Sequence, residues 1–295
     1  MPRSKDESLL SEKIIVMKKF VVLSIFACLF VGAAWAQKTI TVLHTSDTHS
    51  CILPQNANLA DTVIAGRGGF LRRIAMLREE RQKDPDLLYF DSGDFSQGSS
   101  YYTMFQGDVE IELMNRMGIE ASTIGNHEFD FGLDNMARLF RKANFPIVCS
   151  NYDFADTELK DIVKPYIVIK RKGVKIGVFA LCPPLEGLVF TKNYGPLRFR
   201  DPVEVTRQMV ELLKKQKKCD LVVCISHLGW EVTEYPDNRF IQNTAGVDLV
   251  LGGHSHTYFN RLEYVNNKEG KAIPVDQNGK HGAFIGKLTL TLQKK

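Results

Sequence analysis

Residues 247–256 read VDLVLGGHSH, a short apolar run followed at once by two glycines and two histidines. An apolar run of this length that ends at turn-forming residues is typical of a buried strand. His254 and His256 stand two positions apart, just beyond the expected end of this strand. Imidazole is a common metal ligand, and ligand sites of α/β folds lie beyond the carboxyl ends of strands. The segment therefore predicts a metal site at the end of a central strand.

Four other segments repeat this arrangement. Each places metal-binding side chains beside glycine or another turn-former after an apolar run, and they are Asp47-Thr48-His49, Gly93-Asp94, Gly125-Asn126-His127-Glu128 and Ser226-His227. Five of the seven histidines in the chain lie in these five segments. A random surface distribution of histidine would not align with strand ends in this way. We therefore predict one hydrolytic centre that holds two metal ions.

Taken singly, some of these segments have ordinary explanations. Asp47 could be a turn-former or a helix N-cap, and Asp94 could belong to a common Gly-Asp turn. His227 could be a buried strand histidine. Asp47 and His49 stand two apart, so in extended chain their side chains point the same way and could chelate one ion. The combination of segments favours the metal site over these alternatives.

The segment 125–128 is more specific. Asn126 offers an uncharged oxygen ligand, which suits a second metal whose site already holds a carboxylate. His127 cannot easily bind the same ion as its neighbour and is better placed to face a substrate. For His254 and His256 the alternative is a pair of surface histidines, which the preceding buried strand makes a poor explanation.

The chain between the segments alternates strand and helix patterns without internal repeats. Strands are predicted at 39–45, 87–90, 121–124, 146–149, 166–170, 174–181, 221–225, 247–251, 261–265 and 283–292, and helices at 70–81, 108–117, 133–142 and 201–218. Asp201 followed by Pro202 is a typical helix start. Each motif follows a predicted strand, and the patterns by themselves indicate a mixed α/β protein.

The N-terminal segment resembles an export signal. A basic pair at Lys18-Lys19 precedes an apolar stretch at 20–31, and Ala34-Trp35-Ala36 is a typical cleavage site. The apolar stretch is too short for a stable membrane span. We expect 1–36 to be a signal peptide, with Met17 as an alternative start, followed by one domain at 37–295 in the periplasm.

Cys28 offers an alternative to simple export, which is attachment of the exported chain to a lipid. Cys28 lies in a sequence that loosely resembles a lipid-attachment site, although bulky Phe26 and the apolar residues after Cys28 argue against lipid attachment. The mature chain would carry five cysteines, an odd number, and several lie in apolar strand patterns where cysteine packs as a small hydrophobe. Without a CxxC pair, thiolate zinc binding is not expected. We predict no essential disulfide.

Composition excludes some classes of function. The chain has 295 residues, of which 44% are hydrophobic and 24% charged, as in ordinary globular proteins. A formal net charge of +4 is too small to attract a nucleic acid polymer by charge alone. We therefore expect a small phosphoester substrate and neither nucleic acid binding nor a transmembrane span.

The motifs together resemble a known family. In chain order they are LHTSDTH (43–49), FDSGD (90–94), TIGNHEFD (123–130), ISHLG (225–229) and GGHSHT (252–257). This series is similar to the calcineurin-like metallophosphatases, and within them to the 5′-nucleotidase/UDP-sugar hydrolase branch. The resemblance covers 38–295. It implies a four-layer α/β/β/α sandwich and a centre of two divalent cations such as Zn²⁺ or Mn²⁺.

The resemblance also implies roles for individual residues. Seven side chains would hold the metals, the first through Asp47, His49 and His256, the second through Asn126, His227 and His254, with Asp94 bridging both. His127 would be the catalytic histidine, and Asp130 would orient it. At the position of His256 this branch often has an amide, so the metal preference is expected to differ.

The same family commonly has a C-terminal domain that binds the nucleoside with aromatic residues and helps to hold the phosphate with arginines. The sequence stops at Lys295, after the strand expected to complete the metal domain, so this second domain is expected to be absent or supplied by a separate chain. Arg67, Phe129, Phe131 and Tyr258 are candidate substrate contacts within the domain. For each of them, packing or simple solvent exposure is the alternative.

The resulting hypothesis is an exported metal-dependent phosphohydrolase that acts on nucleotide phosphate esters. One alternative is a phosphodiesterase for cyclic nucleotides or UDP-sugars, because the same two-metal centre serves both reactions. Another is a catalytic partner subunit that acts only with a separate substrate-binding chain. The complete set of ligands argues against a binding protein without activity.

Overall fold

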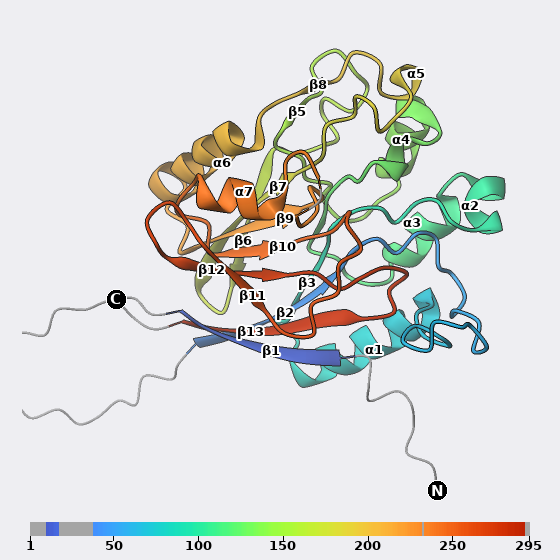
Figure 1. Ribbon diagram of the computed structural model, residues 1–295, viewed down its shortest axis with the longest axis horizontal. Helices are drawn as coiled ribbons and strands as arrows, with labels where there is room; N and C mark the ends of the chain where they lie inside the picture. The colour runs from blue at the N-terminus through green and yellow to red at the C-terminus, as the bar shows by residue number, and fades with distance from the viewer. Residues whose placement is uncertain (1–9, 18–37, 232, 293–295) are drawn as a thin grey trace, which may run out of the picture.

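The computed structural model describes residues 10–17, 38–231 and 233–292 (Figure 1). The basic, apolar and cleavage segments of the predicted signal peptide, at 18–36, lie outside the described residues. Residues 10–17 form strand β1 (Leu10–Met17), which pairs in parallel with β13 (Ile285–Leu292). Within these ranges no helix is both long and apolar enough to cross a membrane. The five cysteines of the ranges are buried free thiols.

Two sheets form the centre of the molecule. The first has the order β1-β13-β2-β3-β4, where β2 is Lys38–Thr45, β3 is Leu88–Asp91 and β4 is Ala121–Ser122. The second has the order β11-β12-β10-β9-β7-β6, with bounds Glu263–Asn266, Ala272–Asp276, Leu249–Leu251, Leu221–Ser226, Val174–Leu181 and Tyr166–Arg171. A small third sheet joins β5 (Tyr152–Asp153) to β8 (Arg198–Phe199).

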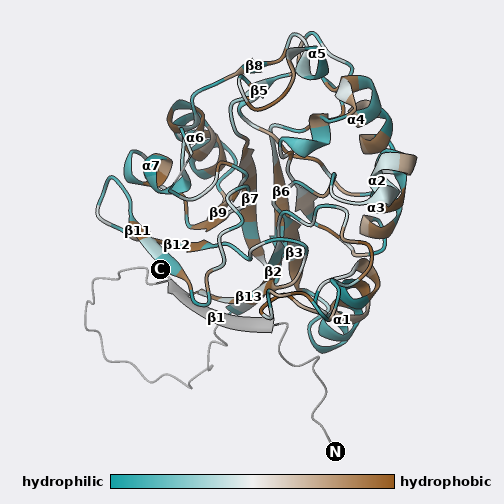
Figure 2. Cartoon of the chain, turned by 45° about the vertical axis from the view of Figure 1, so that its right-hand side comes forward, coloured by the Kyte–Doolittle hydropathy of each residue, from teal (hydrophilic) through white to brown (hydrophobic). Residues whose placement is uncertain are grey.

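The two sheets pack face to face between layers of helix. Along β2, Leu43 packs with the helices α1 (Phe70–Lys83), α3 (Asp108–Met114) and α4 (Gly132–Phe140), whereas its neighbour Val42 packs against the second sheet. Along β9, Val223 faces the first sheet and Val222 faces α6 (Pro202–Glu211) and α7 (Asp237–Gln242). This period of two is the expected pattern for strands buried on both faces. Figure 2 shows the hydrophobic strands between helices with hydrophilic outer surfaces. The four-layer α/β/β/α sandwich is confirmed.

Parallel pairing brings the strand ends together. β2, β3 and β4 run parallel, as do β7, β9, β10 and β12. In register, Thr45 lies beside Asp91, and Leu251 lies beside Ile225. Four of the motifs follow these residues, and the fifth, Gly125–Glu128, follows β4, which pairs with β3 through Ser122 and Asp91. The topology therefore places all five motifs at one edge of the sandwich.

Some local predictions were wrong. The strand predicted at 146–149 makes only single bridges, Ser122 to Ile147 and Val148 to Lys164, because Pro146 lacks an N–H and its neighbour β4 has only two residues. The helix that begins after Asp201, whose carboxylate accepts the Glu204 N–H at 2.9 Å, ends its α-helical part at Glu211 and continues as a π-helical turn at Leu212–Gln216. Strand β12 and the short helices α2 (Ser100–Phe105), α5 (Thr191–Tyr194) and α7 were not predicted.

Candidate metal centre

The structure brings six of the seven predicted metal ligands into overlapping groups. Within each group the candidate ligand atoms lie within 4.8 Å of one another, and the groups are Asp47–His49–His256, His49–Asp94–His127 and Asp94–His227–His254. Asp94 and His49 each belong to two of the three groups, so the groups overlap. Residues that are about two hundred positions apart in the chain thus share one site.

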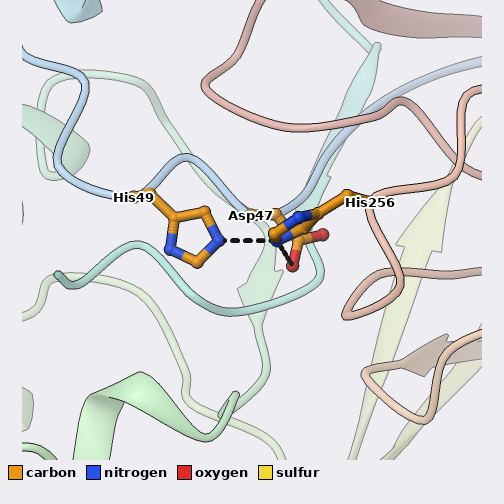
Figure 3. A group of neighbouring side chains, drawn as sticks. All are labelled: Asp47, His49 and His256. Atoms are coloured by element: carbon orange, nitrogen blue, oxygen red, sulfur yellow. Dashed lines mark hydrogen bonds and ion pairs between the residues drawn. The ribbon is translucent and has the colours of Figure 1, made fainter. Parts of the chain in front are cut away.

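The side chains of the first group, Asp47, His49 and His256, lie together as the ligands of one metal ion would (Figure 3). The Nδ1–H of His49 faces the Ser96 carbonyl oxygen at 3.3 Å, which leaves Nε2 as the free nitrogen. This Nε2 lies 2.8 Å from Nε2 of His256, which in turn lies 3.6 Å from Oδ1 of Asp47. Burial, assisted for His256 by the nearby Lys280 ammonium, lowers the pKa of each imidazole to about 4. Two neutral imidazole nitrogens facing one another beside a carboxylate fit a shared cation.

The second group shows the same features. The His227 Nδ1–H donates to the Ser92 carbonyl oxygen at 2.5 Å, so that Nε2 faces Asp94 Oδ2 at 3.2 Å. The ring of His254 lies 5.1 Å from that of His227, and burial lowers the pKa of His254 to about 4. Asn126 Oδ1 is buried and has no hydrogen-bond partner among the described residues. An orphaned buried oxygen is costly unless a ligand satisfies it, so this site also fits a cation.

Two buried carboxylates have opposite electrostatic surroundings. Burial raises the pKa of Asp47 to about 7. Burial opposes ionisation of Asp94 as well, but the neighbouring His227 outweighs it and holds the pKa of Asp94 below its usual range. The surroundings therefore favour the ionised form of Asp94 more than that of Asp47.

His127 and Asp130 form a separate pair beside these groups. The backbone N–H of His127 donates to Asp94 Oδ1 at 2.9 Å, and its Nδ1 lies 3.2 Å from Asp130 Oδ2. One ring nitrogen of His127 lies within 4.8 Å of candidate ligand atoms of His49 and Asp94. Burial lowers the pKa of His127, but the hydrogen bond to Asp130 and the charge of Asp94 outweigh burial and raise it above the ordinary value. The side chain is 32% exposed, so a substrate could reach it.

Five of the predicted ligands have a left-handed backbone. Asp47, His49, Asp94, His254 and His256 have φ between 42° and 72°. Asparagine, aspartate and histidine are the non-glycine residues most often found there. The turn after β4 needs a glycine at position 125, because a Cβ on Gly125 would come within 2.0 Å of Asp94 Oδ1. Tight turns thus bring each ligand to the centre.

Sequence reasoning missed Glu128 as a structural part of the site. This side chain is 2% exposed and accepts the backbone N–H groups of Gly125, Asp94 and Ser96 at 2.6, 3.0 and 3.1 Å. Burial raises its pKa to about 7. Glu128 fixes two motif segments to each other, and a glutamate beside a histidine in a turn was the only signal for it.

Glu128→Ala is expected to lower the free energy of unfolding by about 3 kcal/mol or more, because three buried N–H groups would lose their acceptor. Urea unfolding of both proteins without added metal measures this difference. Glu112→Ala is the matched control, since Glu112 is 64% exposed on α3 and should change stability by at most about 0.5 kcal/mol. Equal unfolding midpoints for Glu128→Ala and the parent would contradict the assignment.

A second missed feature is the buried histidine His44. Its Nδ1 accepts from Asn278 Nδ2 at 2.9 Å, and its Nε2 faces the Ser92 hydroxyl at 2.8 Å. Because Nδ1 accepts, Nε2 is the donor, and the Ser92 hydroxyl is free to donate to the Leu251 carbonyl oxygen at 2.9 Å. Ser92 is also the residue whose carbonyl orients His227. This chain of hydrogen bonds joins the two sheets directly behind the candidate ligands.

The predicted substrate contacts have different surroundings. Phe129 is fully buried in the core beside the α1, α3 and α4 helices, so the alternative of packing holds and its role as a contact is excluded. Phe131 and Tyr258 are each 39% exposed. The Arg67 guanidinium lies 4.9 Å above the ring of Phe284, against which Tyr258 stacks.

Comparisons with known proteins bear on the family and the fold. Residues 40–258 match the family model described as calcineurin-like phosphoesterase. The structure of a 5′-nucleotidase precursor from Thermus thermophilus superposes with a TM-score of 0.78 at 30% identity, over 87% of this chain and 52% of that one. The 5′-nucleotidase of Homo sapiens is 27% identical over 90% of this chain and 48% of its own length. The trifunctional nucleotide phosphoesterase YfkN of Bacillus subtilis is 29% identical over 87% of this chain and 18% of its own. The chain spans about half the length of these relatives or less.

Proposed function

The chain belongs to the calcineurin-like phosphoesterase family, and from this premise we propose that it hydrolyses nucleotide phosphate esters at a centre of two divalent cations. The family consists in general of metal-dependent phosphoesterases, and this chain is related to 5′-nucleotidases at about 28% identity. The observation that supports the proposal most directly is the Asp94 carboxylate, which is shared by two groups of candidate ligands. A carboxylate that is close to both groups of ligands is typical of one centre with two adjacent metal ions, rather than of two separate single-metal sites.

The groups support the ligand assignment for six of the seven side chains, and the unpaired buried Oδ1 of Asn126 supports the seventh. We assign Asp47, His49 and His256 to the first cation, Asn126, His227 and His254 to the second, and Asp94 to both. The two carboxylates and one amide oxygen supply hard ligands, and the imidazoles supply nitrogen, a mixture that suits Zn²⁺ and Mn²⁺. When bound, the two cations would activate water and neutralise the phosphoryl oxygens.

The side chains outside the ligand set supply the remaining chemistry. His127, whose pKa the hydrogen bond to Asp130 raises, would donate its Nε2 proton to the leaving oxygen of the ester. Its backbone N–H to Asp94 fixes the position of the ring relative to the ligands. Because phosphoryl transfer depends mainly on positioning and charge stabilisation, these contacts account for the reaction without a covalent nucleophile.

The proposal is tested by assaying the purified chain with Mn²⁺, Zn²⁺ or Co²⁺ on AMP, UDP-glucose, a 2′,3′-cyclic nucleotide and p-nitrophenyl phosphate. We expect turnover of AMP that requires added metal and stops on chelation. Turnover of only the diesters would instead identify a phosphodiesterase. If the chain binds two metals and hydrolyses none of the four, the proposed function is wrong for this chain alone.

A further inference from the structure

Two candidate ligands of different cations lie on one short segment. His256 belongs to the group of the first cation and His254 to that of the second, and one residue separates them. Both have a left-handed backbone, with φ of 55° and 72°. This conformation is unfavourable for residues other than glycine and persists only where surrounding contacts fix it. The segment 253–257 therefore depends on contacts from the rest of the fold.

Gln277 supplies such contacts from the end of β12. Its side chain is fully buried, and its amide bonds to both ends of the segment. Its Nε2 donates to the Gly253 carbonyl oxygen at 2.8 Å, and its Oε1 accepts the Thr257 N–H at 3.0 Å and the Ser255 hydroxyl at 2.9 Å. One side chain thus holds the backbone before and after the two histidines.

The contacts continue to the segment that carries His227. The Trp230 backbone N–H donates to the Ser255 hydroxyl oxygen at 3.0 Å, and the same hydroxyl donates to Gln277. Trp230 is three positions after His227, the other candidate histidine ligand of the second cation. The Gln277 amide is therefore connected, through one hydroxyl group, to a second ligand segment.

Packing and backbone bonds hold Gln277 itself in place. A Cβ on Gly252 would come within 2.9 Å of Gln277 Nε2 and 3.3 Å of its Cγ, so the side chain lies directly against the backbone that leads into the segment. The Gln277 carbonyl oxygen accepts the Phe259 N–H at 3.0 Å, and the Asp276 carbonyl oxygen accepts the Gly252 N–H at 2.8 Å. Side chain and backbone together form a rigid support for residues 253–257.

We propose that Gln277 is a positioning residue that holds a ligand of each cation in its binding geometry before either ion is bound. The inference rests on the proposed function and concerns the assembly of its metal centre. With Gln277 in place, neither ion has to order the segment. Without Gln277, the first ion to bind would have to order it, and the second ion would find its own ligand already placed.

The test is a titration of the purified, metal-free protein with Co²⁺, followed by calorimetry and by the visible absorption of the bound ion. Gln277→Leu is expected to raise the first stepwise Kd about 10–100-fold, the usual effect of losing an outer-shell partner of a metal site, and to raise the second Kd less. His256→Ala removes a ligand instead, so it is expected to lose one ion and keep the other.

Asn267→Leu is the matched control for the loss of a buried amide. Asn267 lies between β11 and β12, is 7% exposed, and its Oδ1 accepts the N–H groups of Glu269 and Lys271, each at 2.9 Å. This variant should lower the melting temperature of the metal-free protein and leave both Kd values unchanged. A loss of stability alone is thereby separated from a loss of ligand positioning.

Ser255→Ala is a milder variant that covers the case in which Gln277→Leu does not fold. It keeps the Gln277 amide and removes one of its three bonds to the segment. The first Kd is expected to rise about fivefold, the effect of one neutral hydrogen bond, again with a smaller change in the second.

The outcomes separate the positioning role from the proposed function. If the parent binds two ions and hydrolyses no ester while the variants raise the first Kd, the proposed function falls and the positioning role stands. Kd values in Gln277→Leu and Ser255→Ala that shift no more than in Asn267→Leu, or a rise confined to the second step, would overturn the positioning role alone. A parent protein that binds fewer than two ions would overturn both.

Discussion

Replacing His127 with alanine is expected to lower kcat by about 10²–10⁴-fold while two metal ions stay bound, because general acid catalysis contributes a factor of this size. The ring is held by Asp130 through Nδ1 and does not replace any ligand in the assignment above. The measurement is kcat on AMP at saturating metal, together with the metal content of the purified variant.

The metal content decides between two roles of His127. One of its ring nitrogens lies within 4.8 Å of the ligand atoms of His49 and Asp94, so a ligand role is geometrically open to it. A general acid can be removed without loss of metal, whereas a ligand cannot. Loss of a metal ion from His127→Ala would therefore refute the catalytic assignment.

The pH profile of Asp130→Asn provides the companion measurement. Burial lowers the pKa of His127 and the hydrogen bond to Asp130 raises it, with a net increase. A histidine with a raised pKa stays protonated, and so active as an acid, to higher pH. Without the Asp130 carboxylate this pKa falls, so the alkaline decline of kcat should begin at lower pH. A profile identical to that of the parent would exclude Asp130 as the residue that sets this pKa.

Asp94→Ala is expected to abolish binding of both metals and to lower kcat by more than about 10³-fold, since two bound cations supply several kcal/mol of transition-state stabilisation. The carboxylate is 2% exposed, faces His227 Nε2 through Oδ2 and accepts the His127 N–H through Oδ1. Its removal takes a shared ligand from both sites and leaves two partners unsatisfied.

Metal content and kcat measure the effect, with Asp86→Ala as control because Asp86 is an exposed acid just before β3. Asp86→Ala should bind two metals and turn over as the parent does. If Asp94→Ala keeps one metal with parent affinity, the carboxylate belongs to a single site and does not bridge.

The sequence allows the ligand segments to be predicted because each combines an apolar strand pattern, a turn-former and a ligand side chain within a few residues. His254 and His256 after 247–251 are the clearest case. Glu128 and His44 could not be assigned in this way, since what they contact is the backbone of Ser96 and the side chains of Ser92 and Asn278, remote in sequence. Their roles depend on tertiary packing.

The predictions for two strand segments were wrong for a related reason. β12 contains Pro274, which is unusual inside a strand, yet its antiparallel neighbour β11 and parallel neighbour β10 hold it in the sheet. The segment at 146–149 has the better strand pattern but lacks a long partner strand. Pairing across the fold, rather than local preference, decided both outcomes.

The left-handed backbone at five candidate ligands has a consequence for mutational tolerance. β-Branched residues are strongly disfavoured at φ near +50°, so valine or isoleucine at Asp47 or His254 should be rejected in a library that is selected for folding alone, without metal and without substrate. Glycine and asparagine should survive such a selection at the same positions. The residues that this backbone tolerates overlap with those that coordinate a cation. Selection for folding and selection for catalysis therefore restrict the residue types at the same positions. A conserved pattern at these positions does not by itself indicate activity.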